Sequence, residues 1–424
     1  MSFILLNTKV FNKMENLVEK ICNDLKTTYD ARLLNDYPES LQKVFFEVAE
    51  KNKNNKKKNT NSSLISLVNN LKDPKSEKVD YITGPSEIMK LKSDKYNKTI
   101  YLIGENDHSN INGCKSINLI GKKHLEISDY LLYLFKTSPI FIDFYVEWPI
   151  LFGNTNTFKI GSGQTLYDMF NYMKGCVTNL KHRECPYNVR IHSVDARKIQ
   201  GKNKYKKMYY GSTLSKMADD IRSELFFDKL KKHYILFNDF KILYKIEIDL
   251  LSKVSTYDDI INIISNEIKK NKLLSKELNK CILPSDVIVN GFLHYLKLKL
   301  AYIFPRGITF VGEWFKYAKK SRVYERRSPQ RYPDGLHNIE RFMTVVTSII
   351  MDIYTISRMF KVFDVKKNEH YPLEPFNIIF YGGNAHTQSL MYFLYSIGFK
   401  LIENEYTNLI SCLDMKKIKQ PLFL

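Results

Sequence analysis

Four short apolar segments of this chain are each followed by side chains that can bind or move a proton. The first is Ile100-Tyr-Leu-Ile-Gly-Glu-Asn-Asp-His108, which stops at Gly104 and then presents Glu105 and His108. A glycine lets the chain turn sharply off a strand, and a carboxylate three residues before an imidazole can orient it or share a water or a metal ion with it. We therefore expect Glu105 and His108 to lie in a catalytic site.

Two further segments end in acids. Phe144-Tyr-Val-Glu147-Trp-Pro149 places Glu147 where a proline stops a strand, and Ile191-His-Ser-Val-Asp195-Ala-Arg197 places Asp195 in an equivalent position. A structural interpretation stands beside the functional one: Glu147 is then a solvated residue at a strand end, and Arg197 only pairs with Asp195.

The fourth segment is Ile378-Ile-Phe-Tyr-Gly-Gly-Asn384-Ala-His386-Thr. It predicts a strand, a glycine turn that carries Asn384, and a helix that begins near His386. The positive end of a helix dipole disfavours the imidazolium form, so we expect His386 to be the neutral imidazole that a base or a metal ligand requires.

The elements around these motifs alternate between short apolar strands and longer amphipathic segments, which is typical of βαβ units. The expected strands are Thr99 to Ile103, Ile140 to Val146, Val189 to Val194 and Asn377 to Tyr381, with a further pair at Phe399 to Ile402 and Leu409 to Cys412. Polar residues after successive strands gather at one edge of such a sheet, where open α/β sheets bind ligands. The fold class is therefore α/β, with a central, mainly parallel (mixed) sheet flanked by helices.

The chain divides into two parts. Residues 1–78 form a helical N-terminal extension that contains a lysine- and asparagine-rich loop at 51–61, and residues 79–424 form the α/β domain. A helical insertion at about 214–320 is expected to cover the sheet. A long helix at 336–360 carries Arg341 and leads into the last motif strand.

Bulk composition bounds the partners and the location. The net charge of +20 invites a nucleic-acid partner, but abundant Lys, Asn, Ile and Tyr are also what an AT-rich genome encodes, which indicates a large DNA virus or a protist as the source. Six scattered cysteines favour free thiols. With no membrane span and no signal peptide expected, we predict an intracellular, cytoplasmic protein, or one in a virion or an infected host cell; the sequence indicates no oligomeric state.

Taken together, the motifs resemble the erythromycin esterase, ChaN and TraB/Tiki superfamily. The resemblance lies in Gly104-Glu105-x-x-His108, in Glu147-Trp148-Pro149, in the strand that ends at Asp195 and in the turn Asn384-Ala385-His386. The esterase branch has His-Asn-x-His at the last motif, whereas Gly383 stands at the first of those positions here, which is more similar to the TraB/Tiki branch.

This resemblance implies a cleft where His108 and His386, with Glu105 and Glu147, hold a water or a divalent metal ion. It also implies that Arg341 lies on a helix that reaches the same cleft. The function that follows is hydrolysis of an ester, a lactone or an amide in a small molecule or a peptide: Glu147 or Glu105 orients His108, His108 takes a proton from the attacking water, and His386 or Arg341 stabilises the oxyanion.

Two alternatives stay open at this point. In a metal-dependent version, His108, His386 and one or both glutamates are ligands of a divalent ion that acidifies the water. In the other class, the site is degenerate and the protein is a binding or structural component, such as a virion protein. Its basic loop would then contact nucleic acid or another anion through four arginines, Arg322, Arg326, Arg327 and Arg331.

Overall fold

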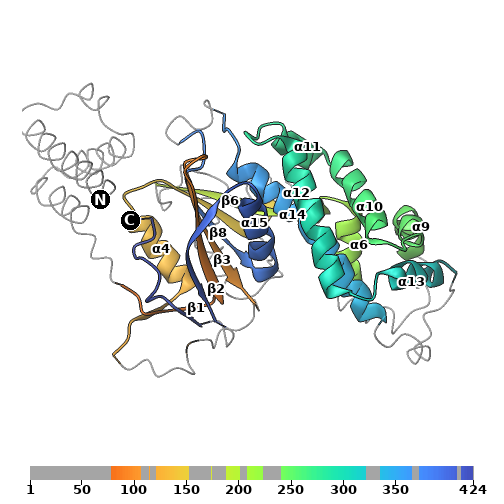
Figure 1. The fold of residues 1–424 in the computed structure, drawn as a ribbon, viewed down its shortest axis with the longest axis horizontal. Helices are drawn as coiled ribbons and strands as arrows, with labels where there is room; N and C mark the ends of the chain where they lie inside the picture. Colours follow the sequence, from red (N-terminus) through yellow and green to blue (C-terminus); the bar gives the residue numbers. More distant parts are fainter. Residues whose placement is uncertain are drawn as a thin grey trace, which may run out of the picture.

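A seven-stranded mixed sheet forms the centre of the protein, in the order β7-β6-β5-β8-β3-β2-β9 (Figure 1). The computed structural model describes residues 78–106, 114, 121–151, 173, 188–200, 208–222, 240–320, 335–364, 372–407 and 412–423. The strands of this sheet are β2 (Glu87–Ser93), β3 (Lys98–Glu105), β5 (Ile142–Leu151), β6 (Val189–Gln200), β7 (Met208–Tyr210), β8 (Asn377–Gly383) and β9 (Lys400–Tyr406). The four central strands β3, β8, β5 and β6 run parallel, and the outer strands are antiparallel to their neighbours. The predicted α/β fold with a mainly parallel sheet is therefore confirmed.

Both faces of the sheet are buried, and the alternation of side chains along each strand divides them between two cores. In β3, Ile100 and Leu102 belong to the core beneath the helices that follow β7, whereas Tyr101 and Ile103 belong to the core beneath α4 (Ile127–Thr137). This is the period-2 pattern of a strand whose two faces are both covered. The run Ile100–Ile103 of β3 is wholly apolar because neither of its faces meets water.

A helical part covers the first of these faces, and Figure 1 shows it extending away from the sheet. Its helices are α6 (Thr213–Arg222), α9 (Lys245–Leu251), α10 (Tyr257–Lys270), α11 (Lys272–Leu278), α12 (Ser285–Ile303), α13 (Thr309–Lys320), α14 (Gly335–Met359) and α15 (Asn384–Ser396). Among the described residues of 214–320, all regular elements are helices apart from a single isolated bridge between Cys281 and Lys361.

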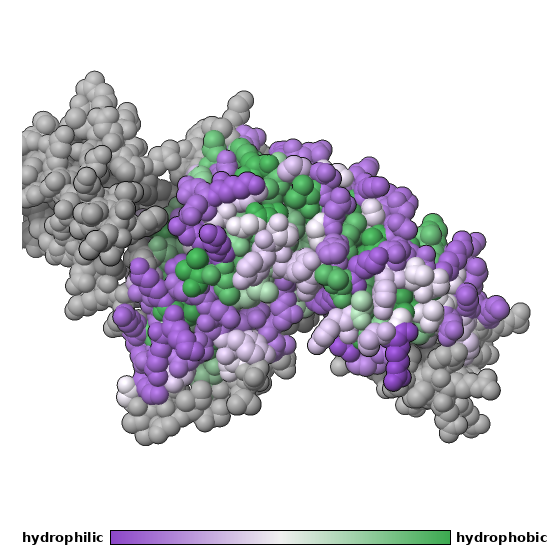
Figure 2. Space-filling model, in the orientation of Figure 1, coloured by the Kyte–Doolittle hydropathy of each residue, from purple (hydrophilic) through white to green (hydrophobic). Residues whose placement is uncertain are grey.

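The long helix α14 is the centre of the helical part. Its segment His337–Met359 is long and apolar enough to cross a membrane, but 83% of the most apolar window is buried inside the protein. A core helix passes the same test, and the burial identifies α14 as one. The face of the molecule in Figure 2 mixes hydrophilic side chains with smaller apolar areas.

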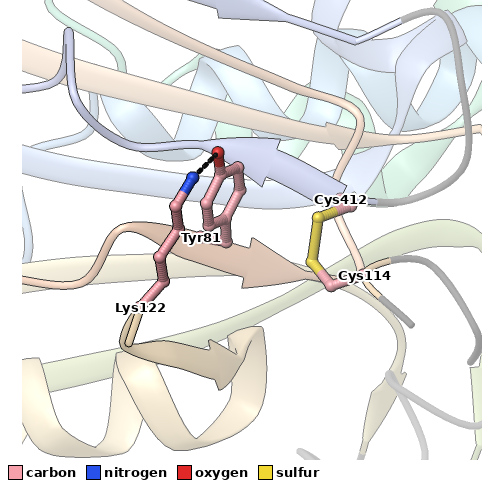
Figure 3. Close-up of a disulfide and its surroundings, with 4 residues drawn as sticks. All are labelled: Tyr81, Cys114, Lys122 and Cys412. Carbon is pink, nitrogen blue, oxygen red and sulfur yellow. Dashed lines mark hydrogen bonds between the residues drawn. A yellow bond between two sulfur atoms is a disulfide. The ribbon is translucent and has the colours of Figure 1, made fainter. Parts of the chain in front are cut away.

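A second, three-stranded sheet lies on the α4 side, in the order β10-β1-β4, with strands β1 (Tyr81–Thr83), β4 (His124–Glu126) and β10 (Cys412–Asp414). A disulfide joins Cys114 to Cys412 across 298 positions of sequence, beside the Tyr81 ring, whose hydroxyl accepts a hydrogen bond from Lys122 (Figure 3). The expectation of free thiols is wrong for these two cysteines, because folding brings together residues that no local spacing relates. Cys281 is free; Cys22, Cys176 and Cys185 lie outside the described residues.

Candidate functional site

The carboxyl ends of the central parallel strands bring three of the sequence motifs to one edge of the sheet. Glu105 ends β3 and is in register with Gly383 at the end of β8. Glu147 follows the last regular pair between β5 and β8, Val146 with Tyr381. Asp195 lies on β6 opposite Pro149 of β5. The strands therefore align these acids at the same edge, as the order of the motifs predicts.

His386 lies in the first turn of α15 and is held between two carboxylates. Its Nδ1 is 2.5 Å from Oδ1 of Asp352 on α14, and its Nε2 is 3.5 Å from Oε1 of Glu147. The contact with Asp352 is within hydrogen-bond distance, whereas 3.5 Å to Glu147 is long for a hydrogen bond. The His386 side chain is only 6% exposed, so this arrangement is fixed by packing.

Glu147 has further partners. Its Oε1 accepts from Nη2 of Arg197 at 2.8 Å, and its Oε2 accepts from the backbone N–H of Gly383 at 2.8 Å. Arg197 also donates through Nε to Oδ1 of Asp195 at 2.7 Å. We call Glu147, Asp195, Arg197, Asp352 and His386 the charge cluster; it joins β5, β6, α14 and α15.

A glycine makes room for this cluster at position 382. A Cβ on Gly382 would lie 2.9 Å from Oε2 of Glu147 and 2.8 Å from the Phe380 ring. These distances are shorter than real Cβ contacts, so any larger residue would push Glu147 away from the N–H of Gly383. The two glycines that the sequence places in this turn therefore have different tasks: one leaves space, and the other supplies a hydrogen-bond donor.

The charge cluster sets the protonation state of His386. Burial disfavours the imidazolium, but the negative charges of Asp352 and Glu147 and their hydrogen bonds outweigh it and raise the pKa of His386 to about 9. The expectation of a neutral imidazole is therefore wrong. The expectation rests on the helix dipole alone, an effect of up to about 2 kcal/mol. The two carboxylates that raise the pKa are distant in sequence from His386.

Arg197 is the other cation of the cluster. Burial opposes its charge, but Asp195 and Glu147 raise its pKa above the ordinary arginine value. The guanidinium thus stays charged and pairs with both acids, which lie within β5 and β6 and not at the strand ends that the sequence predicts. Arg197 does pair with Asp195, as the structural interpretation expects, but the same side chain also pairs with Glu147.

Glu105 faces the other side of the sheet. It is 2% exposed, it lies two and four residues after Ile103 and Tyr101 of the α4-side core, and its Oε2 accepts a hydrogen bond from the Tyr381 hydroxyl at 2.5 Å. Tyr381 belongs to the same core. Glu105 therefore does not join Glu147 and His386 on one face, contrary to the expected convergence. The alternation of side chains along β3 places Glu105 on the α4 side of the sheet, whereas Glu147 lies on the side of α14 and α15.

Asn384 lies at the same sheet edge, where its amide donates to the Ser86 hydroxyl at 2.8 Å and to the side chain of Asn106. It connects the start of α15 to one end of the β2–β3 pair, where β2 begins and β3 ends. A Cβ on Gly104 would collide with the Asn384 side chain. Asn384 thus braces the turn in which His386 lies.

Arg341 is exposed on α14. It precedes Asp352 by eleven residues, which is roughly 16 Å of helical rise. The helix that carries Arg341 does reach the charge cluster, as the resemblance implies, but it does so through Asp352. Sequence reasoning missed Asp352, although it is the only charged residue between 342 and 357, and an isolated acid in an apolar helix is a signal of a buried partner.

His108 lies outside the described residues, as do Arg322, Arg326, Arg327 and Arg331 of the basic loop and the lysine-rich loop at 51–61. Within the described ranges, no group of three or more His, Cys, Asp or Glu side chains is arranged to hold a metal ion. Glu147 is already paired with Arg197. The described residues therefore do not fit a divalent ion on their own.

A second buried polar cluster occupies the opposite, amino edge of the parallel strands. Asp143 Oδ1 accepts from Arg190 Nε at 2.6 Å and from His192 Nε2 at 2.8 Å, and His192 Nδ1 accepts from Arg358 Nη2 at 2.9 Å. Burial lowers the pKa of His192 to about 3, although Asp143 opposes the shift. His192 is therefore a neutral, structural histidine that joins β5, β6 and α14, and it is far from the edge where its strand ends.

Comparison of the chain with protein-family models, curated proteins and solved structures found no match. Function must therefore be argued from the charge cluster itself.

Proposed function

We propose that this protein is a hydrolase of the erythromycin esterase/TraB-Tiki type, in which His386 acts on an ester, a lactone or an amide at the carboxyl edge of the sheet. One observation carries the proposal. Asp352 fixes Nδ1 of His386 at 2.5 Å, while Nε2 has only the long, 3.5 Å contact with Glu147. An imidazole that a carboxylate orients through one nitrogen, and whose second nitrogen is held less closely, is the arrangement that acid–base catalysis uses.

The protonation state assigns His386 its role. Because its pKa is raised to about 9, His386 is an imidazolium at neutral pH, and Nε2–H can donate to a carbonyl oxygen as negative charge develops there. Asp352 stabilises the imidazolium, and Arg197 holds Glu147 and Asp195 in place through its two ion pairs. A preorganised donor of this kind typically contributes on the order of a hundredfold or more in rate.

The base of this mechanism is proposed from the sequence. His108 follows Glu105 by three residues, just beyond the end of β3, and it is the candidate that removes a proton from the attacking water. No step of the mechanism needs a metal ion.

The proposal is tested with a panel of esters, lactones and peptides, assayed with EDTA and with added Zn²⁺, Mn²⁺ or Mg²⁺. We expect turnover by the wild-type protein that falls at least about a hundredfold in His386→Gln. His337→Gln is the matched control, because His337 is a largely exposed histidine on α14. Equal rates in His386→Gln and His337→Gln, or no turnover of any substrate, would reject the hydrolase.

A second candidate is a catalytically degenerate protein that binds an anion or nucleic acid. It is favoured by the fact that Glu147 and Asp195 are both already paired with Arg197, as in a network that only maintains the fold. Salt-dependent retention on DNA or RNA that is lost in Arg326→Ala/Arg327→Ala would support it. Negligible retention at low salt would count against it.

A further inference from the structure

Asp352 has an unsatisfied oxygen. Oδ1 binds His386, but Oδ2 is buried and has no hydrogen-bond partner among the described residues. The whole residue is only 1% exposed. A buried charged oxygen without a partner costs free energy, so the surroundings of Asp352 should contain a group that compensates it.

Counted over the described residues that form it, the charge cluster has one more acid than base. Glu147, Asp195 and Asp352 carry three negative charges, whereas Arg197 and protonated His386 carry two positive ones. Asp352 is the most enclosed of the three acids. We therefore place the residual negative charge on this buried carboxylate. Another cation near Asp352 would make the cluster neutral.

Lys299 on α12 is that cation. Its Nζ donates to the backbone carbonyl of Ala385, the residue before His386, at 3.5 Å, and it lies 5.4 Å from the centre of the Tyr295 ring. Burial lowers the pKa of Lys299, and attraction by the Asp352 carboxylate opposes that shift. The geometry agrees with this: Lys299 contacts the residue before His386, and Asp352 binds the His386 ring from α14.

The present partner of Lys299 is a weak one. A distance of 3.5 Å is at the limit for a hydrogen bond, and an ammonium group has three donors on a flexible chain. The Ala385 carbonyl that it contacts lies in the first turn of α15, whose dipole disfavours a nearby cation. The position of Lys299 beside the first turn of α15 is explained if the Asp352 carboxylate on α14 attracts its ammonium group.

We infer that Lys299 is a positioning residue of the proposed hydrolase: its ammonium group is the counter-ion of Asp352 Oδ2 through a bridging water, and it keeps Asp352 oriented toward His386. The inference rests on the proposed function for its effect on catalysis. It assigns a functional role to the helical insertion, since α12 then supplies a residue to the site as well as covering the sheet (Figure 1).

The test compares Lys299→Met, Lys299→Arg and Lys297→Met. Lys297 is the matched control, because it lies on the same helix and pairs with Asp258 at the surface. The first readout does not require turnover: in protein labelled with ¹⁵N-histidine, the Nδ1–H proton of His386 is observed by NMR. We expect its downfield signal to shift or disappear in Lys299→Met and to be retained in Lys299→Arg and Lys297→Met.

The second readout is kinetic. We expect Lys299→Met to lower kcat about tenfold with KM within about twofold of wild type, as for other residues that orient a catalytic group, and Lys299→Arg to restore most of it. If Lys299→Met does not fold, Lys299→Gln replaces it. An unchanged His386 signal in a folded neutral variant would overturn the inference. Absence of turnover in the wild type would instead reject the hydrolase, and the NMR comparison would still decide the role of Lys299.

Discussion

Glu105 ends β3, and Glu147 lies within β5, which continues through Pro149 to Leu151 instead of stopping there as the sequence predicts; the two carboxylates lie on opposite faces of the same sheet. Glu147 belongs to the charge cluster beneath α14 and α15, whereas Glu105 accepts a hydrogen bond from Tyr381 in the α4-side core. The two carboxylates therefore have separate tasks, and variants of their partners should have separable effects.

The first prediction concerns Tyr381. Tyr381→Phe removes a buried donor to Glu105, which should lower the free energy of unfolding by about 1–3 kcal/mol and leave any His386-dependent activity within about twofold. Tyr130→Phe is the control, because the Tyr130 hydroxyl is buried without a partner among the described residues, so its removal should not destabilise the protein. Urea unfolding measures both. Equal losses in the two variants would contradict the assignment of Glu105 to the core.

The second prediction is the alkaline limb of the stability profile. The pKa of His386 is raised to about 9 in the folded protein, above its unfolded value, so its contribution is complete below about pH 6.5 and is lost as the pH rises toward 9. The difference in unfolding free energy between wild type and His386→Gln should therefore decline by about 1.4 kcal/mol per pH unit within this window. A difference that stays constant from pH 6.5 to 9 would show that His386 is not held as a cation.

The third prediction is the acid limb, which has the opposite sign. Burial lowers the pKa of His192 to about 3, so the unfolded chain takes up a proton below about pH 6.5 that the folded protein does not. Stability should fall as the pH decreases from 6.5 toward 3, again by about 1.4 kcal/mol per pH unit from this residue. The measurement is the same profile in His192→Gln, which should be flatter; a parallel profile would contradict the buried neutral histidine.

The fourth prediction concerns the disulfide. Cys412→Ser opens a covalent loop that spans 298 positions, and loss of a bridge of this kind should lower the free energy of unfolding by about 2–4 kcal/mol. Cys281→Ser is the control, since Cys281 is a free cysteine. Denaturant unfolding of both variants without reductant measures the effect. If dithiothreitol changes the stability of Cys412→Ser as much as that of wild type, the bridge is not the source of the difference.

The sequence predicts the sheet well and the site only in part. Strands such as Asn377–Gly383 have a dense apolar run and a glycine turn, so their existence and direction follow from local pattern. The edge where Glu147, Asp195 and His386 meet follows from the parallel order. The motifs do not tell on which face of the sheet each side chain lies. The alternation of side chains along β3 and β5 places Glu105 and Glu147 on opposite faces.

The partners of the site come from longer range. Asp352 and Lys299 reach His386 only because α14 and α12 pack against α15, and no spacing in the chain relates them. The same limit explains the error about His386: its local setting at a helix start favours a neutral ring, whereas its tertiary setting between two acids favours a cation. The pairing of Cys114 with Cys412 was hidden for the same reason.

The bridge between Cys114 and Cys412 also determines how the protein responds to mechanical force. Because the bond closes the chain between residues 114 and 412, strands β5 to β9 and the helical part lie inside a covalent ring, whereas β2 and β3 precede it. Tension applied at the two chain ends would pass through this bond and extend only the segments outside the ring. The charge cluster would therefore carry none of the load until the disulfide is reduced.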